Sequence, residues 1–324
     1  MTRRPAPVII SCGEPAGIGP EIAVRAWEAL KSDVNMVWMG DTRHLPAGSV
    51  FQTITDLAEA SDVVQNALPV LHHPFASAIT PGIPDPRNAK GVIDVIAACV
   101  GLVQTGQACA LCTAPIHKKA LMDGAGFAHP GHTEYLSDLG GGGRAIMMLA
   151  SEQLRVVPTT IHIALEDVPH ALTPDLLRET IEITARALHD QFGIAKPRLA
   201  VAGLNPHAGE GGAMGRQELE WIADLIDQMG GEGHDLRGPL PADTMFHAAA
   251  RAGYDAAIAM YHDQALIPIK TLDFDRGVNV TLGLPFVRTS PDHGTAFDIA
   301  GKGLANPSSM IEALKLAAKM ARAG

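Results

Sequence analysis

Short apolar runs alternate with longer amphipathic stretches along most of the chain. The run PVIISC ends at residue 12, and a glycine-rich turn leads from it into an amphipathic stretch that starts at Pro20. Proline is favoured at the first position of a helix, so this order predicts a strand followed by a helix. The alternation continues to a predicted C-terminal helix over 308–322. It indicates βαβ units with mostly parallel strands.

The remaining elements follow from the same pattern. Prolines interrupt the stretch 51–87, which is therefore predicted as short pieces. Further strands are predicted at 35–40, 109–115 and 145–149, and further helices at 88–103, 173–192, 216–229 and 242–252.

Composition supports an α/β protein. The 324 residues are 47% hydrophobic but only 4% aromatic, so the core is built of Ala, Val, Ile and Leu. Such a core suits helices packed on a parallel sheet better than a β-sandwich. The length allows two domains or one large α/β unit.

Charge and hydropathy narrow the range of partners. The formal net charge of −10 argues against nucleic acid, because neutralising phosphates requires a basic face. An anionic small substrate would therefore need a local cationic pocket. No apolar stretch reaches the ~18 residues of a membrane helix. The start MTRRPAPVII lacks a long apolar region and a processing site, so we expect a cytoplasmic protein that begins with a strand.

Three apolar, strand-like runs each lead to a histidine: His162 in RVVPTTIHIAL, His207 in RLAVAGLNPHAGEGG and His262 in AAIAMYHDQALIP. Ligands of open α/β sheets bind outside the carboxyl ends of the strands. Three imidazoles there would form a catalytic metal site with an open fourth position. The spacings are too long for a local motif, so three unrelated histidines at strand ends are the alternative.

Glycine-rich segments offer a second candidate site. Gly13 to Gly19 follows a strand and opens a helix, as a phosphate-binding loop does. The segment lacks the G-K-[ST] of a P-loop and the full G-x-G-x-x-G of a dinucleotide fold, so a tight turn is the alternative.

Longer motifs carry a family resemblance. HGTAFDIAGKGLANP resembles the nucleotide-binding signature of the isocitrate and isopropylmalate dehydrogenase fold. Together with GEPAGIGPEI, TAPIHKKAL, PGHTEYL, LNPHAGEGG, YHDQALIPIK and TLGLPFVRTS, it makes the chain similar to the 4-hydroxythreonine-4-phosphate dehydrogenases of pyridoxal phosphate biosynthesis. The resemblance implies two α/β/α lobes around a cleft. We place the first lobe, with the nucleotide segment, at 1–128 and 271–324, and the second, with the metal ligands, at 129–270.

The resemblance also implies roles for individual residues. It makes His162, His207 and His262 ligands of a divalent metal, and Asp243 and His132 the candidates for the proton acceptor. The implied substrate-binding residues are His132, Thr133, Lys270, Asn279 and Arg288. In the nucleotide segment, we expect His293, Gly294, Thr295 and Asp298 to contact the adenosine half of NAD. An acidic residue near the ribose would repel a 2′-phosphate, which favours NAD over NADP.

The implied reaction is the NAD-dependent oxidation of 4-phosphooxy-L-threonine to 2-amino-3-oxo-4-phosphooxybutanoate, which decarboxylates to 3-amino-2-oxopropyl phosphate. The metal would lower the pKa of the substrate hydroxyl. Imidazole ligands suit zinc, cobalt or nickel better than magnesium but do not fix the metal. The resemblance further implies a homodimer with its active site at the interface. A dehydrogenase of 4-phospho-threonate, 4-phospho-erythronate or a cyclic dihydrodiol is the alternative within the family; a metal-dependent hydrolase and a non-catalytic metal-binding protein are the alternatives outside it.

Overall fold

The computed structural model describes residues 6–323, and this part of the chain forms two compact units. The first unit contains residues 6–145 and 284–322, and the second contains 146–283 and residue 323. Each unit holds strands and helices in alternation, so the predicted α/β class is confirmed. In the described chain, no helix is long and apolar enough to cross a membrane.

The first unit is built on a parallel sheet in the order β3-β4-β2-β1-β5-β12. Its strands are β1 (Val8–Ser11), β2 (Met36–Gly40), β3 (Phe51–Ile54), β4 (Leu68–His72), β5 (Ala110–Thr113) and β12 (Arg288–Pro291). Its helices are α1 (Gly19–Leu30), α2 (Ala60–Val63), α3 (Ala89–Gln104), α4 (Lys118–Ala125), α5 (His132–Leu139) and α11 (Ser308–Ala323).

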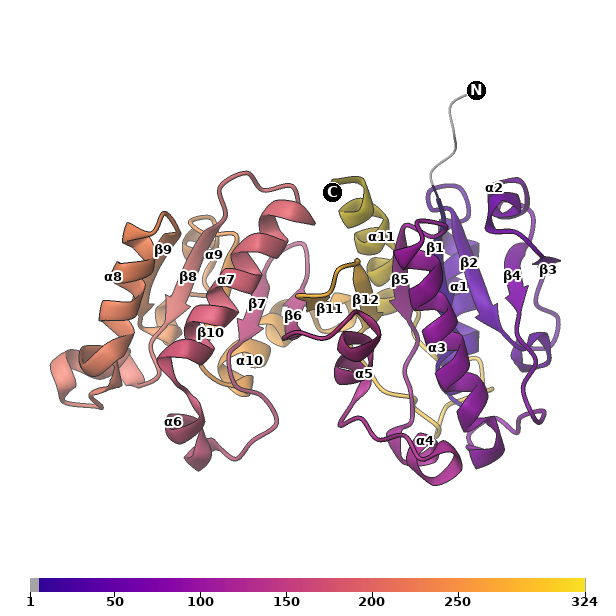
Figure 1. Cartoon of the computed structure of the whole chain (residues 1–324), viewed down its shortest axis with the longest axis horizontal. Helices are drawn as coiled ribbons and strands as arrows, with labels where there is room; N and C mark the ends of the chain where they lie inside the picture. Colours follow the sequence, from indigo (N-terminus) through magenta and orange to yellow (C-terminus); the bar gives the residue numbers. More distant parts are fainter. Residues whose placement is uncertain (1–5, 324) are drawn as a thin grey trace. The chain divides into compact units, whose positions relative to one another are not determined.

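Helices lie on both faces of this sheet because the connections run in opposite directions. Through α1 the chain passes from β1 to its neighbour β2, whereas through α3 it returns from β4 past β2 and β1 to β5. Crossovers between parallel strands are right-handed, so reversing the direction puts α1 and α3 on opposite faces. Figure 1 shows α3 in front of these strands.

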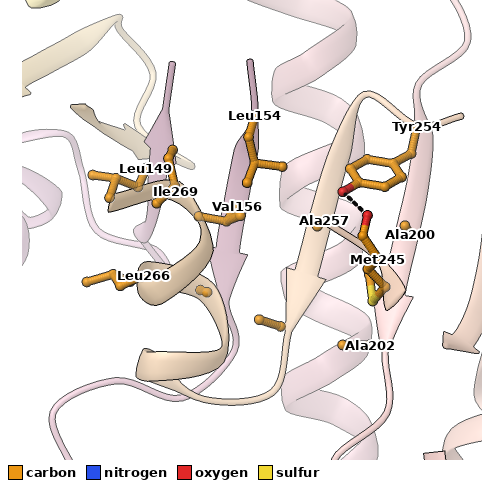
Figure 2. Close-up of a cluster of buried hydrophobic side chains, with 12 residues drawn as sticks. Leu149, Leu154, Val156, Ala200, Ala202, Met245, Tyr254, Ala257, Leu266 and Ile269 are labelled. Atoms are coloured by element: carbon orange, nitrogen blue, oxygen red, sulfur yellow. Dashed lines mark hydrogen bonds between the residues drawn. The ribbon is translucent and has the colours of Figure 1, made fainter. Parts of the chain in front are cut away.

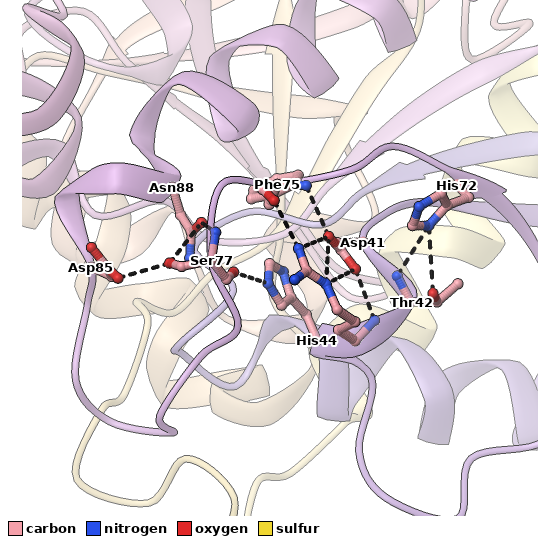
Figure 3. Close-up of polar contacts among 9 residues, drawn as sticks. Asp41, Thr42, His44, His72, Phe75, Ser77, Asp85 and Asn88 are labelled. Atoms are coloured by element: carbon pink, nitrogen blue, oxygen red, sulfur yellow. Dashed lines mark hydrogen bonds and ion pairs between the residues drawn. The ribbon is translucent and has the colours of Figure 1, made fainter.

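A buried polar network holds the segment after β4 against the end of β2 (Figure 3). Asp41, which is fully buried, accepts hydrogen bonds from the backbone N–H of Phe75 at 2.8 Å and from the side chain of Arg43. Burial alone would raise the pKa of Asp41, but these hydrogen bonds outweigh it and lower that pKa. Ser77 then bonds to Asp85 and Asn88, which continues the network to the start of α3.

The second unit has the sheet order β11-β6-β7-β10-β8-β9. Strands β7, β10, β8 and β9 are parallel to one another, whereas β6 runs antiparallel between β11 and β7. The strands are β6 (Ile146–Ala150), β7 (Arg155–Pro158), β8 (Arg198–Ala202), β9 (Asp235–Leu240), β10 (Ala256–Ala259) and β11 (Val278–Leu282). The helices are α6 (Val168–Ala171), α7 (Pro174–Asp190), α8 (Ala223–Gly231), α9 (Ala248–Arg251) and α10 (His262–Asp273).

A cluster of small and branched apolar side chains fills the space between these strands and α10 (Figure 2). Val156 and Ile269 are fully buried in it, as are the alanines Ala200 and Ala257. Small side chains on the strands allow helices to pack closely, which explains how the chain forms a core with so few aromatic residues. Tyr254 is an aromatic member of this otherwise aliphatic cluster. Its hydroxyl donates a hydrogen bond of 2.9 Å to the carbonyl of Met245.

Two sequence predictions need correction. The stretch 242–252 is not one helix but a short turn, Ala242–Thr244, followed by α9. The units divide after residues 145 and 283 rather than after 128 and 270, because α5 packs on α3 in the first unit and β11 pairs with β6 in the second.

The Tyr254 hydroxyl supplies a stability test. We expect Tyr254→Phe to lower the free energy of unfolding by about 1 kcal/mol, because it leaves the buried carbonyl of Met245 without this donor and changes little else. Urea denaturation measures the effect. An unchanged free energy of unfolding would show that the hydrogen bond contributes nothing net.

Candidate functional site

The three candidate metal ligands follow adjacent parallel strands of the second unit. His162 comes after β7, His262 after β10 and His207 after β8, and these strands are neighbours in the order β7-β10-β8. The carboxyl ends of parallel strands share one edge of a sheet, so the fold brings the three segments to the same edge. This arrangement could not be read from the sequence spacing.

Two of the three imidazoles are in direct contact. The ring centroids of His162 and His262 lie 5.7 Å apart. Two imidazoles on one ion, with metal–nitrogen distances of about 2.0–2.1 Å, have centroids separated by about 5 Å. The two rings also line a pocket of about 330 Å³ together with Thr160, Tyr261 and Asp263.

Carboxylates orient two of the rings. Nδ1 of His262 lies 2.7 Å from Oδ1 of Asp263, and Nδ1 of His207 lies 3.3 Å from Oε2 of Glu210. A histidine whose Nδ1–H donates to a carboxylate presents the lone pair of Nε2. Metal-binding histidines are commonly held in this way.

His207 lies in an unusual loop. The residues His207 to Gly211 all have positive φ, including the non-glycine residues His207, Ala208 and Glu210. His162 also has a positive φ, of 54°. Such backbone strain is concentrated at functional sites, where the surrounding structure imposes it.

As the side chains stand, the three histidines do not yet form a closed metal centre. Across residues 6–323, no group of three or more His, Cys, Asp or Glu side chains is positioned to hold one ion. The side chain of His207 is 58% exposed, and that of His262 is 40% exposed. The donor chemistry and the shared sheet edge therefore fit a metal, whereas joining His207 to the other two rings requires its exposed side chain to move.

Asp243 belongs to the same edge. It follows β9, the parallel neighbour of β8, and is exposed in the turn Ala242–Thr244. This turn contacts the loop of His207. An ionised carboxylate accepts protons and hydrogen bonds only, which suits a general base.

A second polar group lies in the first unit around Arg288. This residue begins β12, is only 4% exposed, and donates from Nε and Nη2 to the hydroxyl of Thr113 at 3.2 and 2.6 Å. Burial lowers the pKa of Arg288 to about 10, so the guanidinium is still charged at neutral pH. Its charge makes this a local cationic centre in an otherwise acidic protein.

His132 adjoins Arg288 at the first turn of α5, and Thr133 follows it. Nδ1 of His132 lies 3.5 Å from Nη2 of Arg288, which can only donate. The proton of neutral His132 therefore resides on Nε2, and this atom is buried with no partner in the described structure. Burial and then the charge of Arg288 hold the pKa of His132 well below its usual range. His132 is thus a neutral donor beside a cation.

The remaining predicted substrate residues lie in the second unit. Lys270 is half-buried in α10, with Nζ 5.6 Å from the centroid of the Phe274 ring. Asn279 is on β11, and its side-chain oxygen is buried without a hydrogen-bond partner among residues 6–323. The predicted substrate set is therefore divided between the two units.

The two candidate nucleotide segments are in contact with each other in the first unit. The N–H of Ile18 donates to the carbonyl of Thr295 at 3.0 Å, and a Cβ at Gly17 would lie 2.8 Å from the same oxygen. Gly294 is exposed, and a Cβ there would meet nothing within 4 Å, so a ligand can approach its backbone closely. Asp298 is exposed as well, and Nε2 of His293 is buried without a partner in the described chain.

Sequence reasoning missed the buried polar residues that hold the strand ends and the loops after them in place. Gln264 accepts a hydrogen bond from the N–H of Met260 at 2.7 Å and donates to the carbonyl of Gly203 at 2.8 Å, which ties the ends of β10 and β8 together. Glu218 and Thr113 are buried polar residues with similar holding roles. Gln264 lies in the motif that contains His262, but its partners are remote in sequence and became visible only in the fold.

A parallel sheet with polar side chains gathered at its carboxyl edge is the architecture of α/β enzymes. Comparison with known proteins is more specific. The family model "Pyridoxal phosphate biosynthetic protein PdxA" matches residues 31–317, and the chain belongs to this family.

Relatives match this chain over almost its whole length. The chain is 73% identical over 322 residues to the 4-hydroxythreonine-4-phosphate dehydrogenase of Roseobacter denitrificans, covering 99% of both chains. It is similar to the crystal structure of 4-hydroxythreonine-4-phosphate dehydrogenase from Klebsiella pneumoniae, with 36% identity, a TM-score of 0.89, and coverage of 98% of this chain and 99% of that one. A terephthalate 1,2-cis-dihydrodiol dehydrogenase from Burkholderia xenovorans is more distant, with 26% identity, a TM-score of 0.69 and coverage of 98% of each chain.

The depressed pKa of His132 makes stability depend on pH. Between its folded pKa and its ordinary value of about 6.5, His132 binds more protons in the unfolded chain than in the folded one. Its contribution to stability is therefore complete above pH ~6.5 and decreases as the pH falls below it. We expect His132→Asn to reduce the loss of unfolding free energy between pH 7.5 and 5.5, measured by urea denaturation. The same loss in both proteins would contradict a buried neutral His132.

Proposed function

We propose that this chain catalyses the NAD-dependent oxidation of 4-phosphooxy-L-threonine to 2-amino-3-oxo-4-phosphooxybutanoate, which loses carbon dioxide to give 3-amino-2-oxopropyl phosphate. The observation that carries the proposal is the gathering of His162, His262, His207 and Asp243 at one sheet edge. The near-complete coverage by relatives of that name supports it.

His162, His207 and His262 would hold the divalent metal. The contact between two of the rings and the carboxylates at Nδ1 of His207 and His262 support this assignment. When bound, the metal would lower the pKa of the substrate hydroxyl. A set of imidazoles favours zinc or cobalt over magnesium.

Asp243 is the better of the two candidates for the proton acceptor. As an exposed carboxylate at the histidine edge, it can take a proton from the substrate hydroxyl. His132 instead offers a proton at Nε2, because Arg288 donates toward Nδ1. We therefore assign His132 to hydrogen bonding with the substrate rather than to proton abstraction.

Charged and polar side chains would recognise the rest of the substrate. Arg288, with His132 and Thr133 at the N-terminus of α5, forms a group suited to a phosphate or carboxylate, because a helix N-terminus and a guanidinium both favour anions. Lys270 supplies a second positive charge. The buried oxygen of Asn279 would accept a hydrogen bond from a donor such as the substrate amine.

The segment containing His293, Gly294, Thr295 and Asp298 would bind the adenosine half of NAD. The open backbone at Gly294 and the exposed carboxylate of Asp298 support this placement, and Asp298 would favour NAD over NADP. When bound, NAD would supply the hydride acceptor. We further propose that the enzyme works in the cytoplasm as a homodimer whose interface contributes to the active site.

Oxidation of a dihydrodiol is the second candidate, since a relative of that name has the same fold at a TM-score of 0.69. Its identity of 26% is far below the 73% of the threonine-phosphate enzyme. The charges of Arg288 and Lys270 favour an anionic substrate, but a terephthalate dihydrodiol also carries two carboxylates, so it is the identity that separates the two candidates.

An NAD-reduction assay tests the proposal. Protein stripped of metal by a chelator and then restored with zinc or cobalt is offered 4-phosphooxy-L-threonine or a cyclic dihydrodiol. We expect turnover only with the phosphorylated substrate and only after metal is restored. His207→Ala should abolish turnover and weaken metal binding, whereas His189→Ala, a change at an exposed histidine on α7, should do neither. Near-normal activity of His207→Ala without bound metal would rule out the metal role.

Charge recognition is tested at Arg288 and Lys270. We expect Arg288→Ala or Lys270→Ala to weaken substrate binding by about 1.5–3 kcal/mol, because each loses a charge-assisted contact. The KM for NAD should change much less. Lys315→Ala, at an exposed lysine of α11, serves as the control. Unchanged substrate binding in both variants would refute the anion pocket.

A further inference from the structure

The loop of His207 has a backbone that does not hold its shape by itself. From His207 to Gly211, every residue is left-handed, and three of the five are not glycine. Each non-glycine residue in this conformation costs free energy that the surrounding structure must supply. The contacts that impose this conformation therefore also determine where the imidazole of His207 is presented.

Glu218 is the buried residue that bonds to the segment entering this loop. It is only 3% exposed, at the start of the π-helical turn Glu218–Ile222. Oε1 accepts the backbone N–H of Asn205 at 2.8 Å, and Oε2 accepts the side-chain amide of Asn205 at 2.9 Å. Both oxygens are thus bonded to the residue that stands two positions before His207.

The loop is closely fitted around this carboxylate. A Cβ at Gly209 would lie 2.8 Å from Oε2 of Glu218, and a Cβ at Gly203 would lie 3.1 Å from Oε1. The carboxylate therefore touches the loop before and after His207. A buried carboxylate is costly unless its oxygens are hydrogen-bonded, and here both are.

We propose that Glu218 is a positioning residue for His207, acting through Asn205 to fix the loop that presents the imidazole to the metal. The inference rests on the proposed metal role of His207. Glu218 does not touch metal or substrate. Removing its carboxylate releases the loop. Metal binding must then also order His207, so the free energy of metal binding becomes less favourable.

The variant Glu218→Ala removes both acceptors, and Glu218→Gln keeps one acceptor oxygen at nearly the same volume. Glu220→Ala is the matched control, since Glu220 lies on the same π-helical turn but is 54% exposed and pairs only with Arg216 among the contacts described. Cobalt affinity is measured on the full-length protein by competition with a chelator. The visible spectrum of the cobalt-loaded protein reports the geometry at the ion, and urea denaturation in chelator reports the stability of the metal-free fold.

We expect Glu218→Ala to lower cobalt affinity at least tenfold and to alter the cobalt spectrum, as changes to groups that orient ligands commonly do. Glu218→Gln should show a smaller loss, and Glu220→Ala should stay within about twofold of the parent. Cobalt affinity and spectrum unchanged in Glu218→Ala would overturn the proposal. If Glu218→Ala does not fold, Asn205→Ala decides. It removes the side-chain bonds to Oε2 of Glu218 and to Oε1 of Gln217, but it keeps the backbone bond to Oε1 of Glu218. Unchanged cobalt affinity and spectrum in Asn205→Ala would overturn the proposal.

His207→Ala, measured in parallel, separates the two levels of inference. Loss of cobalt binding in His207→Ala, with normal binding in Glu218→Ala, would refute only the positioning role. Normal cobalt binding in His207→Ala would refute the proposed metal site itself.

Discussion

Parallel pairing of β7, β10, β8 and β9 is the constraint on which the candidate site depends. Parallel strands end at a common edge, so four chain segments that are far apart in sequence meet there. Each strand is followed within a few residues by one chemically versatile side chain: His162, His262, His207 or Asp243. Side-chain ties such as that of Gln264 between Gly203 and Met260 then fix the spacing of the strand ends.

Three deeply buried charged side chains are held by hydrogen bonds. Asp41, Glu218 and Arg288 are each almost fully buried, and each is hydrogen-bonded to groups from distant segments. An apolar core of small side chains gives close packing but little directional preference, whereas a buried charge has a free-energy minimum only when its partners are in place. The strands bring these segments to one region of the sheet, and the hydrogen bonds of the three residues then fix the positions of the loops.

The division of the chain into two units also divides the chemistry. The candidate metal ligands, Asp243, Lys270 and Asn279 belong to the second unit, whereas Arg288, His132, Thr133 and the candidate nucleotide segment belong to the first. The second unit is therefore rich in side chains that bind metal or accept protons. The first unit combines a cation with hydrogen-bond donors, the combination that binds an anion.

The sequence by itself determined the class of fold and most elements, because strands and helices have different hydrophobic periods and Pro20 and Thr173 mark helix starts. It also determined the family, through long ordered motifs. It did not determine that 242–252 would break into a turn and a short helix, or that the run at Lys270 would be helical, since a short apolar run fits either period. Only the tertiary structure decided which strands are neighbours, that Arg288 directs the proton of His132 to Nε2, and that Glu218 holds the loop of His207. These are contacts between residues remote in sequence, and local patterns carry no information about them.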